Sequence, residues 1–221
     1  MMKNMTLLLL ACFGISLTGC ATHQAIKPQY DATVYKQHMP HSILVLPPVN
    51  DSPEPRATYS FWSTTTVPVA EAGYYVFPLS VVDRMFKENG VTNGHDAQSI
   101  PAAKLKEIFG ADAALYIHLK EYGSKYQVIQ TTTTVSADAK LVDLNTGTVL
   151  WTGSKRIVLS NSDNNNNLVA MLVISVVDQV INQKSDSGYK AAEIVSSQML
   201  TPTQQGGIGL LYGPRSPKYQ P

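Results

Sequence analysis

Histidine and carboxylate side chains are the first groups in this chain that could do chemistry. His38 and His41 stand three residues apart, a spacing that could present two imidazoles to a metal ion from one face of a helix. Pro40 lies between them and no third ligand is nearby, so we expect two linker residues and no metal site.

Asp51 and Glu54 form a pair of acids in a proline-rich stretch. Acid and base catalysis by two carboxyls needs contrasting environments, and nothing here predicts burial of either one. His118 is expected on the polar face of a strand and His95 in a turn, which favours solvated imidazoles over a general base. The sequence also lacks Gly-x-Ser-x-Gly, a phosphate-binding glycine loop and His-Glu-x-x-His. We therefore expect no catalytic residue, cofactor or metal.

Cysteine chemistry is concentrated at position 20. Residues 17–20 read Leu-Thr-Gly-Cys, and they follow Lys3 and an apolar run over residues 5–16. This pattern resembles the bacterial lipoprotein signal, in which the cysteine thiol is diacylated, the chain is cut before it and the new amine is acylated. We expect cleavage between Gly19 and Cys20 and lipid attachment at Cys20. The alternative is a secretory signal with a chance cysteine, but charge, apolar run, small residues and cysteine are all in register.

The expected anchor also predicts a location. The apolar run is shorter than the about 20 residues that a membrane-spanning helix needs, so the chain should be anchored and not span. Diacylglycerol and palmitate chains together hold a protein on a membrane where one chain would hold it only reversibly. Ala21 stands where aspartate would resemble an inner-membrane retention signal, so we expect the outer membrane, with the domain facing the periplasm.

Composition narrows the kinds of site and partner that remain. Cys12 lies in the discarded signal and Cys20 carries lipid, so we expect no disulfide, cysteine zinc site or thiol nucleophile. Cleavage takes Lys3 from the 17 Lys and Arg residues and leaves them balanced against 16 Asp and Glu. A neutral chain without charged blocks argues against nucleic acid as a partner. With 44% hydrophobic and 15% charged residues, one compact domain is expected.

The pattern of apolar residues predicts the elements of this domain. We expect an extended tether over 20–41, a single domain over 42–200 and an irregular tail over 201–221. Strands are expected at 42–46, 74–77, 113–120, 126–144 and from 149, a surface loop at 49–55, and helices at 57–72 with a kink at Pro68, 80–89, 101–109 and 187–200. Early crossovers followed by hairpins predict an α+β two-layer sandwich: a mixed, largely antiparallel sheet with helices on one face.

The segment Leu168–Ile181 is the strongest candidate for an interaction. It is almost wholly apolar, yet at about 14 residues it is too short to span a membrane. Burial in the core is the leading interpretation, and a homodimer or partner helix is the alternative. The residues that would form the contact are Val169, Leu172, Val173, Val176, Val177 and Val180.

Three stretches carry a likeness to a known family: residues 42–48 with Asn50 and Ser52, residues 109–113 (Phe-Gly-Ala-Asp-Ala), and residues 140–147 leading to Trp151. With residues 70–76, they make the mature chain resemble a family of uncharacterised bacterial envelope lipoproteins. More distantly, the pattern is similar to the N-terminal domain of TolB and the periplasmic domain of the curli-secretion lipoprotein. The resemblance implies a periplasm-facing module of an outer-membrane transport or secretion assembly, with other envelope lipoproteins or secretion components as partners. It implies no catalytic residue.

Three functions follow as hypotheses. The first is a non-enzymatic structural or adaptor component of an envelope assembly. The second is a ligand-binding lipoprotein that serves a transporter, which a deep pocket with converging polar groups would favour. The third is an envelope hydrolase, which a buried cluster of titratable residues would favour.

Overall fold

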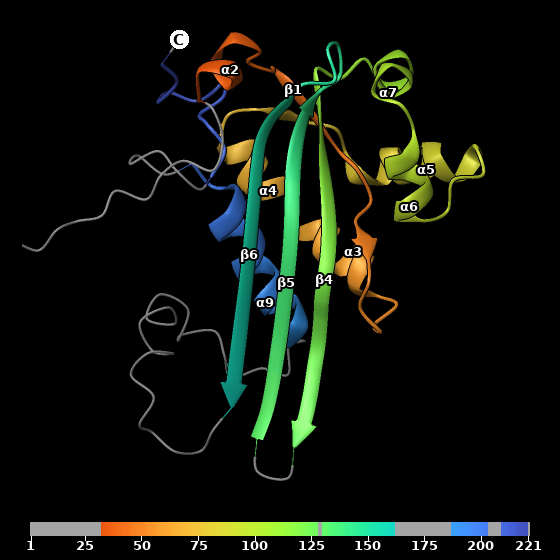
Figure 1. Ribbon diagram of the computed structural model, residues 1–221, viewed down its shortest axis with the longest axis vertical. Helices are drawn as coiled ribbons and strands as arrows, with labels where there is room; N and C mark the ends of the chain where they lie inside the picture. The colour runs from red at the N-terminus through yellow and green to blue at the C-terminus, as the bar shows by residue number, and fades with distance from the viewer. Residues whose placement is uncertain (1–31, 128–129, 162–186, 203–208, 221) are drawn as a thin grey trace, which may run out of the picture.

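The computed structural model describes residues 32–127, 130–161, 187–202 and 209–220 (Figure 1). In chain order its elements are α2 (Ala32–Gln37), β1 (Ser42–Val45), β2 (Val49–Asn50), α3 (Ala57–Thr64), α4 (Thr66–Glu71), β3 (Tyr75–Val76), α5 (Leu79–Glu88), α6 (Gly94–Ser99), α7 (Ala102–Phe109), β4 (Ala113–Gln127), β5 (Gln130–Asp143), β6 (Val149–Asn161) and α9 (Ser187–Leu200). Cys20, Gly19 and all six candidate residues of the 168–181 segment lie outside the described residues.

The six strands form one mixed sheet in the order β3-β1-β4-β5-β6, with β2 also paired to β4. β1 is parallel to β3 and β4, because helices connect these strands, whereas β4, β5 and β6 are antiparallel and follow one another directly. The predicted α+β fold with a mixed, largely antiparallel sheet is confirmed.

One face of the sheet is covered throughout, whereas the other is open along β5, β6 and most of β4. At β1 the consecutive residues Ile43, Leu44 and Val45 are all fully buried, so both faces are covered there. α3, α4 and α9 lie behind the three long strands in Figure 1, and α5, α6 and α7 lie beyond β4 at the side. Phe86 of α5 meets Phe109 of α7 with ring centroids 5.4 Å apart, which joins these helices to each other. The helices are therefore not all on one face, because the second crossover, from β3 to β4, places its helices beside the sheet.

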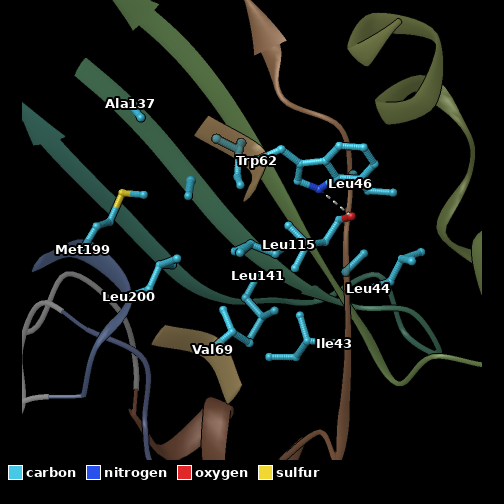
Figure 2. Packing of buried hydrophobic residues seen from close by; sticks show 14 of the residues in the cluster. Ile43, Leu44, Leu46, Trp62, Val69, Leu115, Ala137, Leu141, Met199 and Leu200 are labelled. Atoms are coloured by element: carbon cyan, nitrogen blue, oxygen red, sulfur yellow. Dashed lines mark hydrogen bonds between the residues drawn. The ribbon is translucent and has the colours of Figure 1, made fainter. Parts of the chain in front are cut away.

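The core lies between the sheet and α3, α4 and α9. Ile43, Val69, Leu115 and Leu141 are fully buried and point toward one another (Figure 2). The Trp62 Nε1–H donates to the Val45 carbonyl oxygen at 3.1 Å, so the one polar atom of this buried ring is satisfied. Apolar burial of this kind stabilises the fold by about 1.5–3 kcal/mol for each large side chain.

The helix expected over 57–72 is two helices. The hydroxyls of Thr64 and Thr65 donate to the carbonyl oxygens of Phe61 and Trp62 at 2.7 Å, and α3 ends there. Pro68 lies in the first turn of α4, where a missing N–H costs nothing. The expected break near Pro68 is confirmed, and it falls at Thr65.

Three other boundaries differ from expectation. The loop predicted over 49–55 contains strand β2, whose Val49 and Asn50 pair with β4. Strand β4 does not stop at residue 120: a bulge between Leu119 and Glu121 lets it continue to Gln127 with Tyr122 buried. His95 lies in helix α6 and not in a turn, since the Asn93 side chain accepts the Asp96 N–H as an N-cap.

Both ends of the described chain belong to the domain. Tyr35 of α2 is fully buried and its hydroxyl lies 2.8 Å from that of Tyr74, so the extended tether predicted for 20–41 is wrong at its C-terminal end. Residues 209–220 have no helix or strand, as predicted for the tail, yet Gly213 N–H donates to the Ala72 oxygen at 2.8 Å. The ordered domain therefore extends beyond 42–200, because buried side chains and backbone bonds hold both flanking segments.

Candidate functional site

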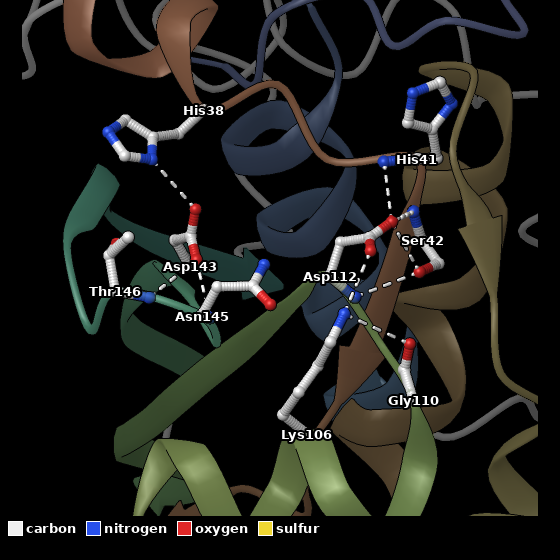
Figure 3. Close-up of polar contacts among 9 residues, drawn as sticks. All are labelled: His38, His41, Ser42, Lys106, Gly110, Asp112, Asp143, Asn145 and Thr146. Atoms are coloured by element: carbon white, nitrogen blue, oxygen red, sulfur yellow. Dashed lines mark hydrogen bonds and ion pairs between the residues drawn. The ribbon is translucent and has the colours of Figure 1, made fainter.

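Two aspartates fasten the N-terminal segment to one end of the sheet (Figure 3). Asp143 ends β5 and begins the turn to β6. Its Oδ1 accepts the N–H groups of Asn145 at 2.6 Å and Thr146 at 3.0 Å, while its Oδ2 lies 3.0 Å from His38 Nδ1. One carboxylate thus shapes the hairpin turn and holds the residues just after α2.

Asp112 makes the second attachment. Its Oδ2 accepts the backbone N–H groups of His41 and Ser42 at 3.1 Å and the Ser42 hydroxyl at 2.9 Å, and its Oδ1 lies 3.2 Å from Lys106 Nζ. Partial burial raises the pKa of this carboxyl, but the Ser42 hydroxyl, the His41 N–H and Lys106 outweigh it, so the net pKa is lowered. Asp112 is therefore a charged clamp on the start of β1.

The stretches that suggested the family resemblance meet at these aspartates. Ser42 opens the first stretch, Asp112 lies in the second and Asp143 in the third. In the first stretch, Asn50 Oδ1 accepts the Ser52 N–H at 3.0 Å and Asn50 Nδ2 donates to the Glu54 oxygen at 2.9 Å, which folds the proline loop. These residues act by holding chain segments together and not by presenting reactive groups.

The open face of the sheet is the second candidate site. Its polar side chains form cross-strand rows from β4 through β5 to β6: Tyr116, Lys140 and Thr152, followed by His118, Asp138 and Ser154. α6 and the end of β2 border this face, and together they line a shallow groove of about 820 Å³. We call this surface the open face.

Charges on the open face are largely paired with one another. His118 Nε2 lies 2.5 Å from Asp51 Oδ2, and Asp138 forms an ion pair with Lys120 and accepts the Ser154 hydroxyl at 2.6 Å. Desolvation raises the pKa of Asp138, but Lys120 and Ser154 outweigh it, so the net pKa is lowered. Burial raises the pKa of Tyr116, and Lys140 Nζ lies 5.1 Å from the centroid of its ring. The result is a nearly neutral polar surface.

The structure places the residues considered for chemistry in separate roles. His38 and His41 are attachment residues of the domain and not parts of a free linker. His118 lies on the polar face as predicted, but it is paired with Asp51, while Glu54 accepts from Arg56. Within the described ranges, no group of three or more His, Cys, Asp or Glu side chains is placed to hold a metal ion. In the same part of the chain, no helix combines the length and apolar character needed to cross a membrane.

Comparison with known proteins identifies the family. The family model of GNA1162-like lipoproteins matches residues 30–215. The chain belongs to the GNA1162-like lipoprotein family. A protein of Neisseria meningitidis serogroup B, lipoprotein NMB1124/NMB1162, is 42% identical over 207 residues, which are 94% of each chain. The predicted membership of an envelope lipoprotein family is confirmed, and the protein is a membrane-anchored envelope lipoprotein.

Two solved structures are similar to this chain. The crystal structure of lipoprotein GNA1162 from Neisseria meningitidis is 48% identical, with a TM-score of 0.55 over 65% of this GNA1162-like chain and 100% of the other. A PelC dodecamer from Paraburkholderia phytofirmans is 14% identical, with a TM-score of 0.44 over 71% of this chain and 84% of the other. The relative with high identity supports the α+β fold described above.

Proposed function

We propose that this lipoprotein is held at the outer membrane by acyl chains on Cys20 and acts as a non-enzymatic adaptor in an envelope transport or secretion assembly. The open face would be the docking surface for its partner. One observation carries the proposal: Asp112 and Asp143 attach the N-terminal segment at one end of the sheet. The open face is therefore left uncovered by any described helix.

The position of the attachment favours presentation of this face. α2 lies at one end of the long strands, and the opposite ends of β4 and β5 project past α3 and α9 (Figure 1). A lead of about 12 residues between Cys20 and α2 could extend at roughly 3.3 Å each, which would let the domain stand off the membrane. The open-face rows begin three residues from Asp143 along β5, near the attached end, and this lead would leave room for a partner between them and the membrane.

The chemistry of the open face favours a protein partner over a polyanion. Its Asp51–His118 and Asp138–Lys120 pairs already restrain these side chains, so less side-chain entropy would be lost when a partner docks. A largely self-paired surface offers little net attraction to a polyanion, and specificity would come from matching hydrogen bonds. These pairs are about half exposed, which is unlike the buried titratable cluster that a hydrolase would need, so we propose no catalytic role.

In-cell photo-crosslinking tests this docking surface. A photoreactive residue would replace Lys140 or Thr152 on the open face, and Glu193, an exposed residue of α9, would be the matched control. We expect adducts with another envelope protein from positions 140 and 152 only. Adducts of equal yield from position 193, or none from the open face, would count against the proposal.

A ligand-binding role for the same face is the second candidate, favoured by the groove of about 820 Å³. Its converging polar groups would suit a small polar ligand, although they already pair with one another. Native mass spectrometry of protein purified from the envelope would detect such a ligand. Thr152→Trp, which fills the groove, should release it, and a ligand-free wild-type protein would exclude this role.

A further inference from the structure

β6 is the last strand of the sheet and offers a long edge. It spans Val149–Asn161, and among the described strands it pairs with β5 alone. A long edge strand presents backbone N–H and C=O groups that can pair with another chain, and natural proteins usually block such edges. Its outer edge is therefore a candidate interface.

Two exposed apolar side chains mark this edge on the open face. Val149 is 48% exposed and Val158 is 45% exposed, and few large apolar residues of the described chain are so accessible. Along β5, Val149 is opposite Val142 and Val158 is opposite Thr134, while Ser154 between them is opposite Asp138. Val142 and Thr134 each lie four residues from Asp138. Val149 is five residues from Ser154 and Val158 four, but a bulge at Leu150 takes up the extra residue, so both valines lie four ladder positions from Ser154 and share its face.

From this symmetry we infer that β6 pairs antiparallel with β6 of a second copy of this chain, about a two-fold axis at Ser154. The axis places each Val149 opposite the partner's Val158, which covers both valines in two identical contacts. Residues directly opposite in antiparallel strands share one face, as this pairing requires. The interface is isologous and joins the two sheets into one.

Charges on β6 are compatible with this register. Arg156 is opposite the partner's Thr152, and Lys155 is opposite the partner's Gly153, so no like charges face each other. Arg156 already pairs with Glu121 of its own chain at 2.8 Å. In the register shifted by two residues toward Asn161, Lys155 would oppose itself and neither valine would meet its counterpart. A shift by one residue would exchange the two faces.

This dimer goes beyond the proposed function and does not depend on it. From the sequence, a homodimer or partner contact through the 168–181 segment was the alternative to its burial in the core, and that segment lies outside the described residues. The edge of β6 gives an interface built from described residues instead.

Cysteine crosslinking in intact cells tests the axis. The full chain has cysteines only at positions 12 and 20, both at the N-terminus. A disulfide at an added cysteine therefore shows that its two copies lie close together. Ser154→Cys faces itself across the axis, and we expect a disulfide-linked dimer on a non-reducing gel after mild oxidation. Val158→Cys is the matched control, because its two copies would lie roughly 26 Å apart at about 3.3 Å per residue. A monomeric Ser154→Cys protein, or equal crosslinking of both variants, would overturn the inference.

Charge exchange tests the register independently. In detergent-solubilised full chain, Val158→Glu should weaken self-association at least about tenfold in sedimentation, a loss of about 1.4 kcal/mol. The double variant Val149→Lys with Val158→Glu should restore it, because each lysine would then oppose a glutamate. Both valines are exposed, so the fold should be unaffected. If the single variant lowered the melting temperature of a monomer instead, the edge would be covered by the chain itself, and the inference would fail.

Discussion

Asp143 is the residue on which the attachment of the N-terminal segment depends most. It is buried, and its carboxylate serves two turn amides and His38. Asp143→Ala should lower the free energy of unfolding by about 1–3 kcal/mol, because buried donors lose their acceptor. Urea denaturation would measure this, with Asn145→Ala as control since that variant keeps the backbone N–H. Equal stability of both variants would contradict the assigned role.

Asp112 should make the stability of the domain depend on pH. Its pKa in the folded state is lowered from the ordinary 3.8, so the ionised form stabilises the fold at neutral pH. That contribution is fully present above 3.8 and is lost as the pH falls through 3.8 toward the lower pKa of the folded state. Asp112→Asn should be less stable than wild type by about 1 kcal/mol at neutral pH, since the carboxyl is partly exposed. Thermal unfolding across this range should show that the difference in stability between wild type and Asp112→Asn becomes smaller in acid. A difference that grows in acid would contradict the role given to Asp112.

The ring of Trp151 leaves no room for a side chain at Gly153. A Cβ at position 153 would overlap the fully buried ring of Trp151, which packs over it toward α9. Gly153→Ala should therefore destabilise the domain by about 1–3 kcal/mol, the usual cost of overpacking. Val158→Ala on the exposed face is the control and should stay within about 0.5 kcal/mol of wild type in the same denaturation experiment. A neutral Gly153→Ala variant would mean that the ring can move.

Among the elements, α2 is the first that the structure describes, and Tyr35 packs it into the domain. Tyr35→Phe removes only the hydroxyl bonded to Tyr74 and should cost about 1 kcal/mol, whereas Tyr35→Ala leaves a cavity and should cost about 3–5 kcal/mol. Hydrogen exchange at His38, whose N–H donates to the Val34 oxygen at 3.2 Å, should accelerate in the alanine variant first. Unchanged exchange would show that α2 does not depend on Tyr35.

The elements show how far the sequence predicts this fold. Alternation over Leu115, Ile117 and Leu119 predicted a strand correctly, because local periodicity carries that information. The extension of β4 past Glu121 could not be predicted, since it depends on a bulge and on pairing with β5. Strand β2 could not be predicted for the same reason, because its two residues form a strand only by pairing with β4.

The candidate site was predictable only in part. The Asn93 cap of α6 was readable in the sequence three residues before Asp96, and it was missed. The meeting of His38 with Asp143 spans 105 residues, and no local pattern signals such a contact. The stretches around Ser42, Asp112 and Asp143 were recognisable as similar to a family, but their shared role as attachments required the structure.

For the whole molecule, we propose that lipid on Cys20 holds the domain at the outer membrane. The family assignment shows an envelope lipoprotein, and the choice of membrane rests on Ala21. Separation of the two membranes on a density gradient, with wild type compared against Cys20→Ala, tests this most directly. We predict wild type in the outer-membrane fractions and loss of Cys20→Ala from them. Wild type in the inner-membrane fractions, or the same distribution for both proteins, would contradict the account.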